Sequence, residues 1–195
     1  MSDKLARKKQ AKLLRNFRKV HRTTGALLFV FFFIISISGG ILGWKKDSNG
    51  IILPETQKGS SVTLEDWLPI AELEEKAIRF FEDSVSTQLN SEISRIDLRK
   101  EKGIAKFLFE ANYYEIQLDG ATGKLLSLGK RNSDLVENIH DGSILDSFFG
   151  TDGVFKLIYT SIMGTALLIF TITGFWLWYG PKKMRNRSRK NRSGI

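Results

Sequence analysis

The stretch TTGALLFVFFFIISISGGILGW, residues 23–44, decides the fold of this chain, because it is 22 residues long and carries no charge. A second uncharged stretch, LIYTSIMGTALLIFTITGFWLWYGP, covers the 25 residues 157–181. At about 1.5 Å per residue, a helix of either length covers the roughly 30 Å of hydrocarbon in a bilayer. We therefore predict an α-helical membrane protein with two transmembrane helices, residues 23–44 and 154–181.

The charges on either side of these stretches predict the orientation. A leader, residues 1–22, holds nine Lys or Arg against one acid, and a tail, residues 182–195, holds seven against none. The segment between the spans, residues 45–153, holds thirteen bases and twenty acids. Basic residues near a span end stay in the cytoplasm. We expect an N-in, C-in arrangement with a periplasmic or extracellular central domain.

The net charge of +9 is concentrated at the two ends. This favours attraction to anionic lipid over nucleic-acid binding. An alternative for the first span is a cleaved signal peptide, because Ser36 and Ser38 precede Gly39 in a small-x-small pattern. The apolar stretch continues beyond that cut, which favours an uncleaved span. The chain has no Cys, so disulfides, thiolate metal sites and thiol catalysis are excluded.

The central segment, residues 45–153, has the pattern of a small α+β domain. After a linker at residues 47–61, residues 63–89 are amphipathic and predict a helix. Four short β-type runs follow, and DGATG at residues 119–123 makes the turn before the last of them. They are residues 93–98, 105–110, 113–118 and 124–128. We expect one helix on a three- or four-stranded antiparallel sheet, then a segment at residues 135–153 that re-enters the membrane. Pro181 is expected to end the second span.

The chain's two His residues, His21 and His140, are the candidate ligand residues because each precedes a span. A His at a span end is either a functional residue or an interfacial side chain that reaches the headgroups. Small residues mark the spans at Gly25, Gly39, Gly43, Gly164 and Gly174. In the first span Gly25, Gly39 and Gly43 share a helix face with His21. Such positions allow close helix packing, and they also leave room for a flat macrocycle beside a ligand.

The topology limits how two His residues can bind one metal. Metal–imidazole bonds are about 2 Å long, so two axial nitrogens on one iron lie roughly 4 Å apart. His21 is expected at the inner face and His140 at the outer face, about a bilayer thickness away. One chain therefore cannot hold one haem with both. A two-fold dimer can pair each His with its own copy in a four-helix bundle.

Three groups of residues resemble the PepSY-associated transmembrane helix family. They are His21-Arg22 with Gly25 and the Ser-Ile-Ser-Gly39 end of the first span, Asp119-Gly-Ala-Thr-Gly123 in the central domain, and Ile139-His140-Asp-Gly142 leading to Thr-Ile-Thr-Gly174. The resemblance covers nearly the whole chain after the leader. It implies a PepSY-like central domain and b-type haem bound by His21 and His140, with electron transfer across the inner membrane in iron uptake. Larger members have four or more spans, so this chain resembles a minimal two-span version.

Two functions follow as expectations. The first is an electron-transfer subunit, a homodimer or a chain with a partner membrane subunit, that passes electrons to an acceptor such as a ferric chelate. The second is a membrane-anchored interaction module whose PepSY-like domain binds a protein or peptide partner without haem. No catalytic constellation and no Gly-rich dinucleotide turn is present, so the chain is at most a redox subunit.

Overall fold

The computed structural model describes residues 2–192 of the chain. It consists of two compact units, which are described separately. The helical unit combines Met1–Ile37 with His140–Ile195, and the sheet unit is Ser38–Ile139. Two long helices belong mainly to the first, and the second contains all four strands.

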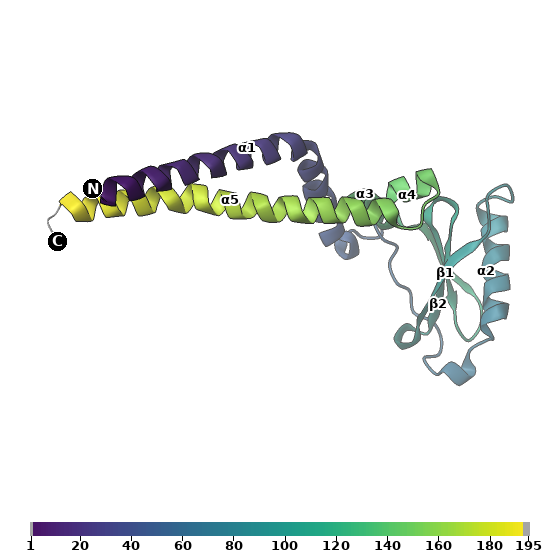
Figure 1. Cartoon of the computed structure of the whole chain (residues 1–195). Coiled ribbons are helices and arrows are strands. Elements are labelled where there is room, and N and C mark those ends of the chain that lie inside the picture. The colour runs from purple at the N-terminus through teal and green to yellow at the C-terminus, as the bar shows by residue number, and fades with distance from the viewer. Residues whose placement is uncertain (1, 193–195) are drawn as a thin grey trace. The chain divides into compact units, whose positions relative to one another are not determined.

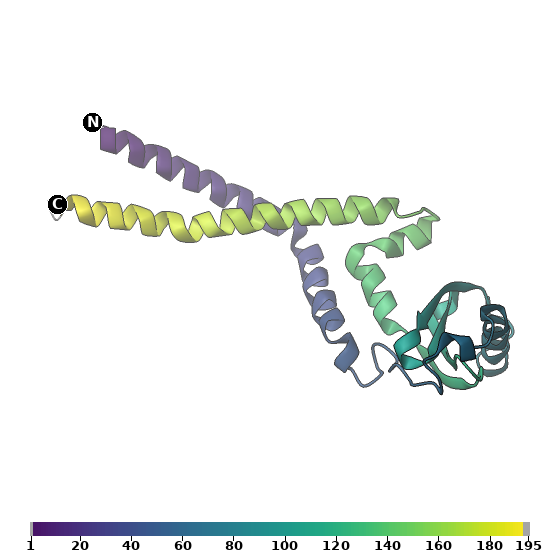
Figure 2. The ribbon, with the colours of Figure 1, turned by 90° about the horizontal axis from the view of Figure 1, so that it is seen from below.

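Two long antiparallel helices, α1 (Ser2–Gly43) and α5 (Val154–Arg192), dominate the helical unit. Both chain ends lie at the same end of the pair in both views (Figures 1 and 2). The basic leader belongs to the same continuous helix as the first apolar stretch. Each helix is long and apolar enough to cross a membrane, and large side chains such as Leu27 (75% exposed) and Leu157 (67% exposed) point outward. An apolar surface of this kind suits lipid, which confirms the predicted membrane protein with two candidate spans.

The expectation that Pro181 ends the second helix is wrong, because α5 continues through it to Arg192. A proline inside a helix removes one backbone hydrogen bond, and its ring crowds the preceding turn. Membrane helices tolerate proline when nearby groups satisfy the freed carbonyl. As far as Arg192, the basic tail therefore continues the second span as helix.

Two short helices lead into α5. They are α3 (Asn132–Asp141) and α4 (Ser143–Phe149), which occupy most of the segment that was expected to re-enter the membrane. Asp146, in α4, contacts the start of α5. Its carboxylate accepts hydrogen bonds from the backbone N–H groups of Phe155 (2.9 Å) and Lys156 (2.8 Å). These are N–H groups of the first turn of α5, which have no partner within the helix. Asp146 thus caps the second span from outside its own helix.

The sheet unit is a four-stranded antiparallel sheet with one helix packed on it (Figure 1). The strands β1 (Ile93–Arg99), β2 (Ile104–Phe109), β3 (Tyr114–Asp119) and β4 (Leu125–Lys130) lie in chain order. The helix α2 (Ile70–Ser84) buries Leu73, Ala77 and Phe81 against the sheet. This confirms the predicted fold class, two membrane helices with a small α+β domain.

The predicted helix at residues 63–89 is too long. A separate 3-10 turn, η2 (Leu64–Asp66), precedes α2, and the intervening Trp67 has an extended backbone. Proline disfavours helical geometry in the residue before it, so Pro69 separates the two elements. Three further 3-10 turns are η1 (Lys45–Asp47), η3 (Lys100–Lys102) and η4 (Ala111–Tyr113).

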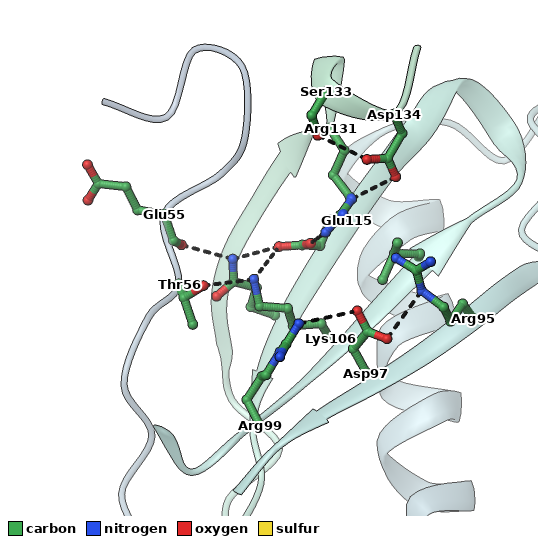
Figure 3. A network of polar contacts seen from close by, with 12 residues as sticks. Glu55, Thr56, Arg95, Asp97, Arg99, Lys106, Glu115, Arg131, Ser133 and Asp134 are labelled. Carbon is green, nitrogen blue, oxygen red and sulfur yellow. Dashed lines mark hydrogen bonds and ion pairs between the residues drawn. The ribbon is translucent and has the colours of Figure 1, made fainter. Parts of the chain in front are cut away.

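A buried polar network centres on Glu115 of β3, within the sheet unit. Its carboxylate accepts hydrogen bonds from Lys106 Nζ (3.2 Å), Gln117 Nε2 (2.7 Å) and Arg131 Nη1 (2.6 Å), as Figure 3 shows for Lys106 and Arg131. The linker joins this network, because Lys106 Nζ donates to Thr56 Oγ1 (3.0 Å) and Gln117 Nε2 donates to the Glu55 carbonyl (2.9 Å). The linker is therefore part of the folded unit.

The turn at residues 119–123 is organised by Asp119. Its carboxylate accepts hydrogen bonds from the backbone and hydroxyl of Ser60 (2.8 and 2.9 Å) and from the backbone N–H groups of Ala121 (2.9 Å) and Thr122 (3.1 Å). Burial opposes ionisation of this carboxyl, but the donors at Thr122, Ser60 and Ala121 outweigh burial and lower the pKa of Asp119.

The lowered pKa of Asp119 predicts acid sensitivity of the sheet unit. A carboxyl whose pKa is lower in the folded state stabilises that state above its unfolded pKa, about 3.9, and the stabilisation is lost as pH falls through the folded pKa. Thermal scans of the full-length protein in detergent between about pH 6 and pH 3 should therefore show falling stability in acid. In Asp119→Asn, which has no titrating carboxyl, we expect lower stability near neutral pH and a flatter pH dependence. An equal pH dependence in both proteins would contradict this assignment.

Candidate functional site

His21 lies against α5 within the helical unit. Its Nδ1 is 2.9 Å from the Thr173 hydroxyl, and its ring stacks on Phe170 with 3.9 Å between the ring centroids. His21 is half-buried, and Thr173 is 3% exposed. One side of the imidazole is thus covered by an aromatic ring, and one ring nitrogen has a buried polar partner.

The hydrogen bonds of Thr173 indicate which nitrogen of His21 remains available. The Thr173 hydroxyl donates to backbone carbonyls of its own helix, Ile169 (2.8 Å) and Phe170 (3.0 Å). When that single proton points to either carbonyl, the same oxygen accepts a hydrogen bond from His21 Nδ1–H. In the neutral ring this places the lone pair on Nε2, the arrangement in which metal-binding His residues are held by a second residue.

Two of the predicted small positions make room for this arrangement. A side chain at Gly25 would come within 2.9 Å of the Phe170 ring, and one at Gly174 would approach His21 Cε1 at 3.4 Å. Gly25 and Gly174 therefore allow Phe170 and His21 to lie between the helices. Gly43 and Gly164 meet no neighbouring atom within 4 Å, and Gly39 is half-buried.

His140, at the end of α3, lines an apolar pocket of about 440 Å³ in the helical unit. The walls come from α1, by way of Phe32 and Ile35, and from one face of α5, where Tyr159, Met163 and Phe170 contribute. Gly164 also lines it, so the missing side chain there adds to its space. This volume is within the usual range of small-molecule sites.

The loop after His140 is fixed to the start of α5. The Asp141 carboxylate pairs with Lys156 Nζ (2.6 Å) and accepts hydrogen bonds from the backbone and hydroxyl of Ser143. Burial opposes ionisation of Asp141, but the bonds from Lys156 and Ser143 outweigh it and lower its pKa. Gly142 has a φ of +81° and lies so close to Tyr159 that a side chain would meet its ring at 2.7 Å. His140 is therefore presented by a tightly held turn.

The two His residues lie at different levels along α5. His21 is level with Thr173, whereas Gly142, two residues after His140, lies against Tyr159, fourteen residues before Thr173. At about 1.5 Å per residue, the separation of these two levels along the helix is roughly 21 Å. It far exceeds the roughly 4 Å between two axial nitrogens on one iron. Within residues 2–192, no group of three or more His, Cys, Asp or Glu is placed to hold a metal ion.

Several residues at this site were not predicted as functional. Thr173 belongs to the Thr-Ile-Thr-Gly174 motif, but nothing in the motif shows that its hydroxyl faces His21. The sequence likewise did not indicate a role for Lys156 or Tyr159. Asp141 was noted only because it follows His140 in the Ile139-His140-Asp-Gly142 motif. Only the register of the two antiparallel helices brings these residues together.

Comparison with known proteins gives a family for the chain. A family model described as the PepSY-associated TM region matches residues 18–194. No curated protein and no solved structure matches at a significant level. The match begins three residues before His21 and includes His140 and both apolar stretches.

Proposed function

The chain belongs to the PepSY-associated TM region family, and from this premise we propose that it is an electron-transfer subunit of the bacterial inner membrane that binds b-type haem through His21 and His140. Haem b would supply a one-electron couple within the membrane. The chain's own residues would hold the two imidazoles at two different levels along the helix pair. The acidic central domain would then face an acceptor outside the cytoplasm, such as a ferric chelate.

The observation that carries this proposal is the hydrogen bond between His21 and Thr173. A ligand imidazole binds metal through one nitrogen and donates its other N–H to an oxygen, which fixes the tautomer and the ring orientation. His21 Nδ1 lies 2.9 Å from a threonine oxygen that is itself tied to its helix backbone. His21 would therefore be suited to hold a haem iron through Nε2.

Each site needs a second ligand from another copy, because the described part of the chain offers one His at each level. The helices have the surface for such an assembly. Gly164 faces open space, and Phe29 (64% exposed) and Phe33 (57% exposed) lie on the outside of α1. A second copy that packs here would pair each His with its own equivalent, as a two-fold axis requires.

The alternative function, an interaction module without haem, has less support from the sheet unit. A peptide partner commonly adds a strand to a free sheet edge. Of the two edge strands, β1 and β4, the first carries Arg95, Asp97 and Arg99, and Asp97 pairs with both arginines (3.2 and 3.8 Å). Charged side chains on an edge strand oppose the addition of another strand.

A reduced-minus-oxidised visible spectrum tests the proposal directly. Full-length protein should be produced with haem supplied and purified in detergent. Paired b-type bands are expected, with close to one haem per chain. A featureless spectrum from well-folded protein would sink the haem proposal and leave the interaction module, whose partner would then be sought by capture on the membrane-anchored chain.

The role of Thr173 gives a sharper prediction. Thr173→Val keeps the shape of the side chain but removes the oxygen that holds His21 Nδ1, so haem affinity should fall roughly 10- to 100-fold with a shifted reduction potential. Thr173→Ser retains a hydroxyl and should restore both properties. Haem titration and redox potentiometry measure them. If valine and serine variants behave alike, Thr173 does not position His21.

A further inference from the structure

An open groove of about 750 Å³ runs along the face of α1 that carries four basic side chains. Arg15, Arg18, Lys19 and Arg22 line it at spacings of three, four and seven residues, which place them on one helix face. Along the helix this stripe is roughly 10 Å long. The next turn adds the Thr23 hydroxyl and then Ala26 and Leu27. The groove thus passes from strongly basic to apolar within three helical turns.

Among residues 2–192, no acidic side chain pairs with these four cations. The sequence has no Asp or Glu between residues 4 and 46 or after residue 152. None of the four forms an ion pair with any part of the chain that the structure describes. Arginines this close repel one another, so a bound anion would lower the free energy of the cluster.

The register of the two helices places the groove at a membrane surface. Phe17 stacks on Trp176 with centroids 6.1 Å apart, and a side chain at Gly180 would contact Leu14. The cationic stripe therefore lies beside the aromatic end of α5, where Trp178 is 65% exposed and Lys182 Nζ lies 5.3 Å from its ring centroid. Tryptophan and tyrosine collect at the level of lipid headgroups.

We propose that this groove is a binding site for an anionic phospholipid, with the phosphate held among Arg15, Arg18 and Arg22 and an acyl chain along Ala26 and Leu27. The order of groups on the helix matches that of the lipid, because cations, a hydroxyl and apolar side chains follow one another as phosphate, glycerol and hydrocarbon do. Guanidinium groups suit phosphate because each offers parallel N–H donors. The leaflet is the one beside both chain termini.

Native mass spectrometry of the full-length protein in detergent tests this site. Phosphatidylglycerol should be retained in preference to phosphatidylcholine. At about 1 kcal/mol per basic residue, the triple change Arg15→Gln, Arg18→Gln, Arg22→Gln should weaken retention by on the order of 100-fold. The matched control Lys182→Gln, Lys183→Gln, Arg185→Gln removes the same charge from the same end of the protein, and it should have a much smaller effect. Equal losses in both triples would overturn a defined site.

A second variant separates a groove from a general attraction to charge. Ala26→Trp keeps every cation but fills the apolar part of the groove, at a position that is exposed and therefore tolerant of a large residue. It should lower retention of phosphatidylglycerol at least several-fold. Unchanged retention would overturn the proposal. Displacement of the lipid by excess inorganic phosphate would also overturn it, because the site would then recognise free phosphate rather than a lipid.

Discussion

Replacing Glu115 by Ala is expected to unfold the sheet unit more than any other single change to its polar groups. The Glu115 side chain is fully buried, and its partners Lys106 and Arg131 are 4% and 14% exposed. Removing the carboxylate leaves a buried ammonium and a largely buried guanidinium without their shared counter-charge, which costs about 3–5 kcal/mol. Amide hydrogen exchange of β2 and β3 in the full-length protein should accelerate by more than roughly 100-fold.

An exposed pair of the same chemistry is the control for this prediction. Glu75 accepts from Arg79 Nη2 at 3.3 Å, but its side chain is 67% exposed. Solvent screens such pairs, so Glu75→Ala should change stability by no more than about 0.5 kcal/mol. If the two variants exchanged at similar rates, the Glu115 network would not stabilise the sheet unit. The simplest reason would then be that Asp134, which pairs with Arg131 at 2.8 Å, still neutralises Arg131 after Glu115 is removed.

The buried network also shows where prediction from sequence stops. Alternation in the strands and the DGATG turn were enough to predict an antiparallel sheet, because period-two burial is a local property. The same alternation places Lys106, Glu115 and Gln117 on the face away from α2, where polar residues ordinarily meet water. They are buried instead because residues 55–57 of the linker lie over them, and a linker has no periodicity that reveals what it covers.

In the helical unit, too, some features were predictable from the sequence and others were not. Length and lack of charge predicted both spans, since the bilayer imposes these properties on any crossing helix. Which side chains meet was not predictable, because it depends on the register of α1 against α5. The contact between His21 and Thr173 joins residues 152 positions apart. The stop expected at Pro181 was also wrong, since α5 continues through that proline to Arg192.

The second large effect is expected in the haem content of single His variants. Thr173 beside His21 and Tyr159 beside Gly142 are roughly 21 Å apart along α5, so His21 and His140 would serve two separate haems in a two-fold dimer. His21→Ala should therefore remove about half of the bound haem, and His140→Ala the other half, while the double variant should bind none. Pyridine haemochrome assay against protein concentration measures the ratio, and the remaining half should keep its own reduction potential.

The stoichiometry separates the proposed arrangement from its competitors. Loss of all haem in either single variant would mean one haem per assembly or a dimer that cannot form without both sites. Loss in neither would mean that haem binds elsewhere. Asp146→Asn is a useful structural control, because it weakens the cap on the first turn of α5 without touching an imidazole. Since Asp146 lies outside the pocket lined by His140, its variant should retain both haems if the ligands themselves, rather than general helix stability, determine binding.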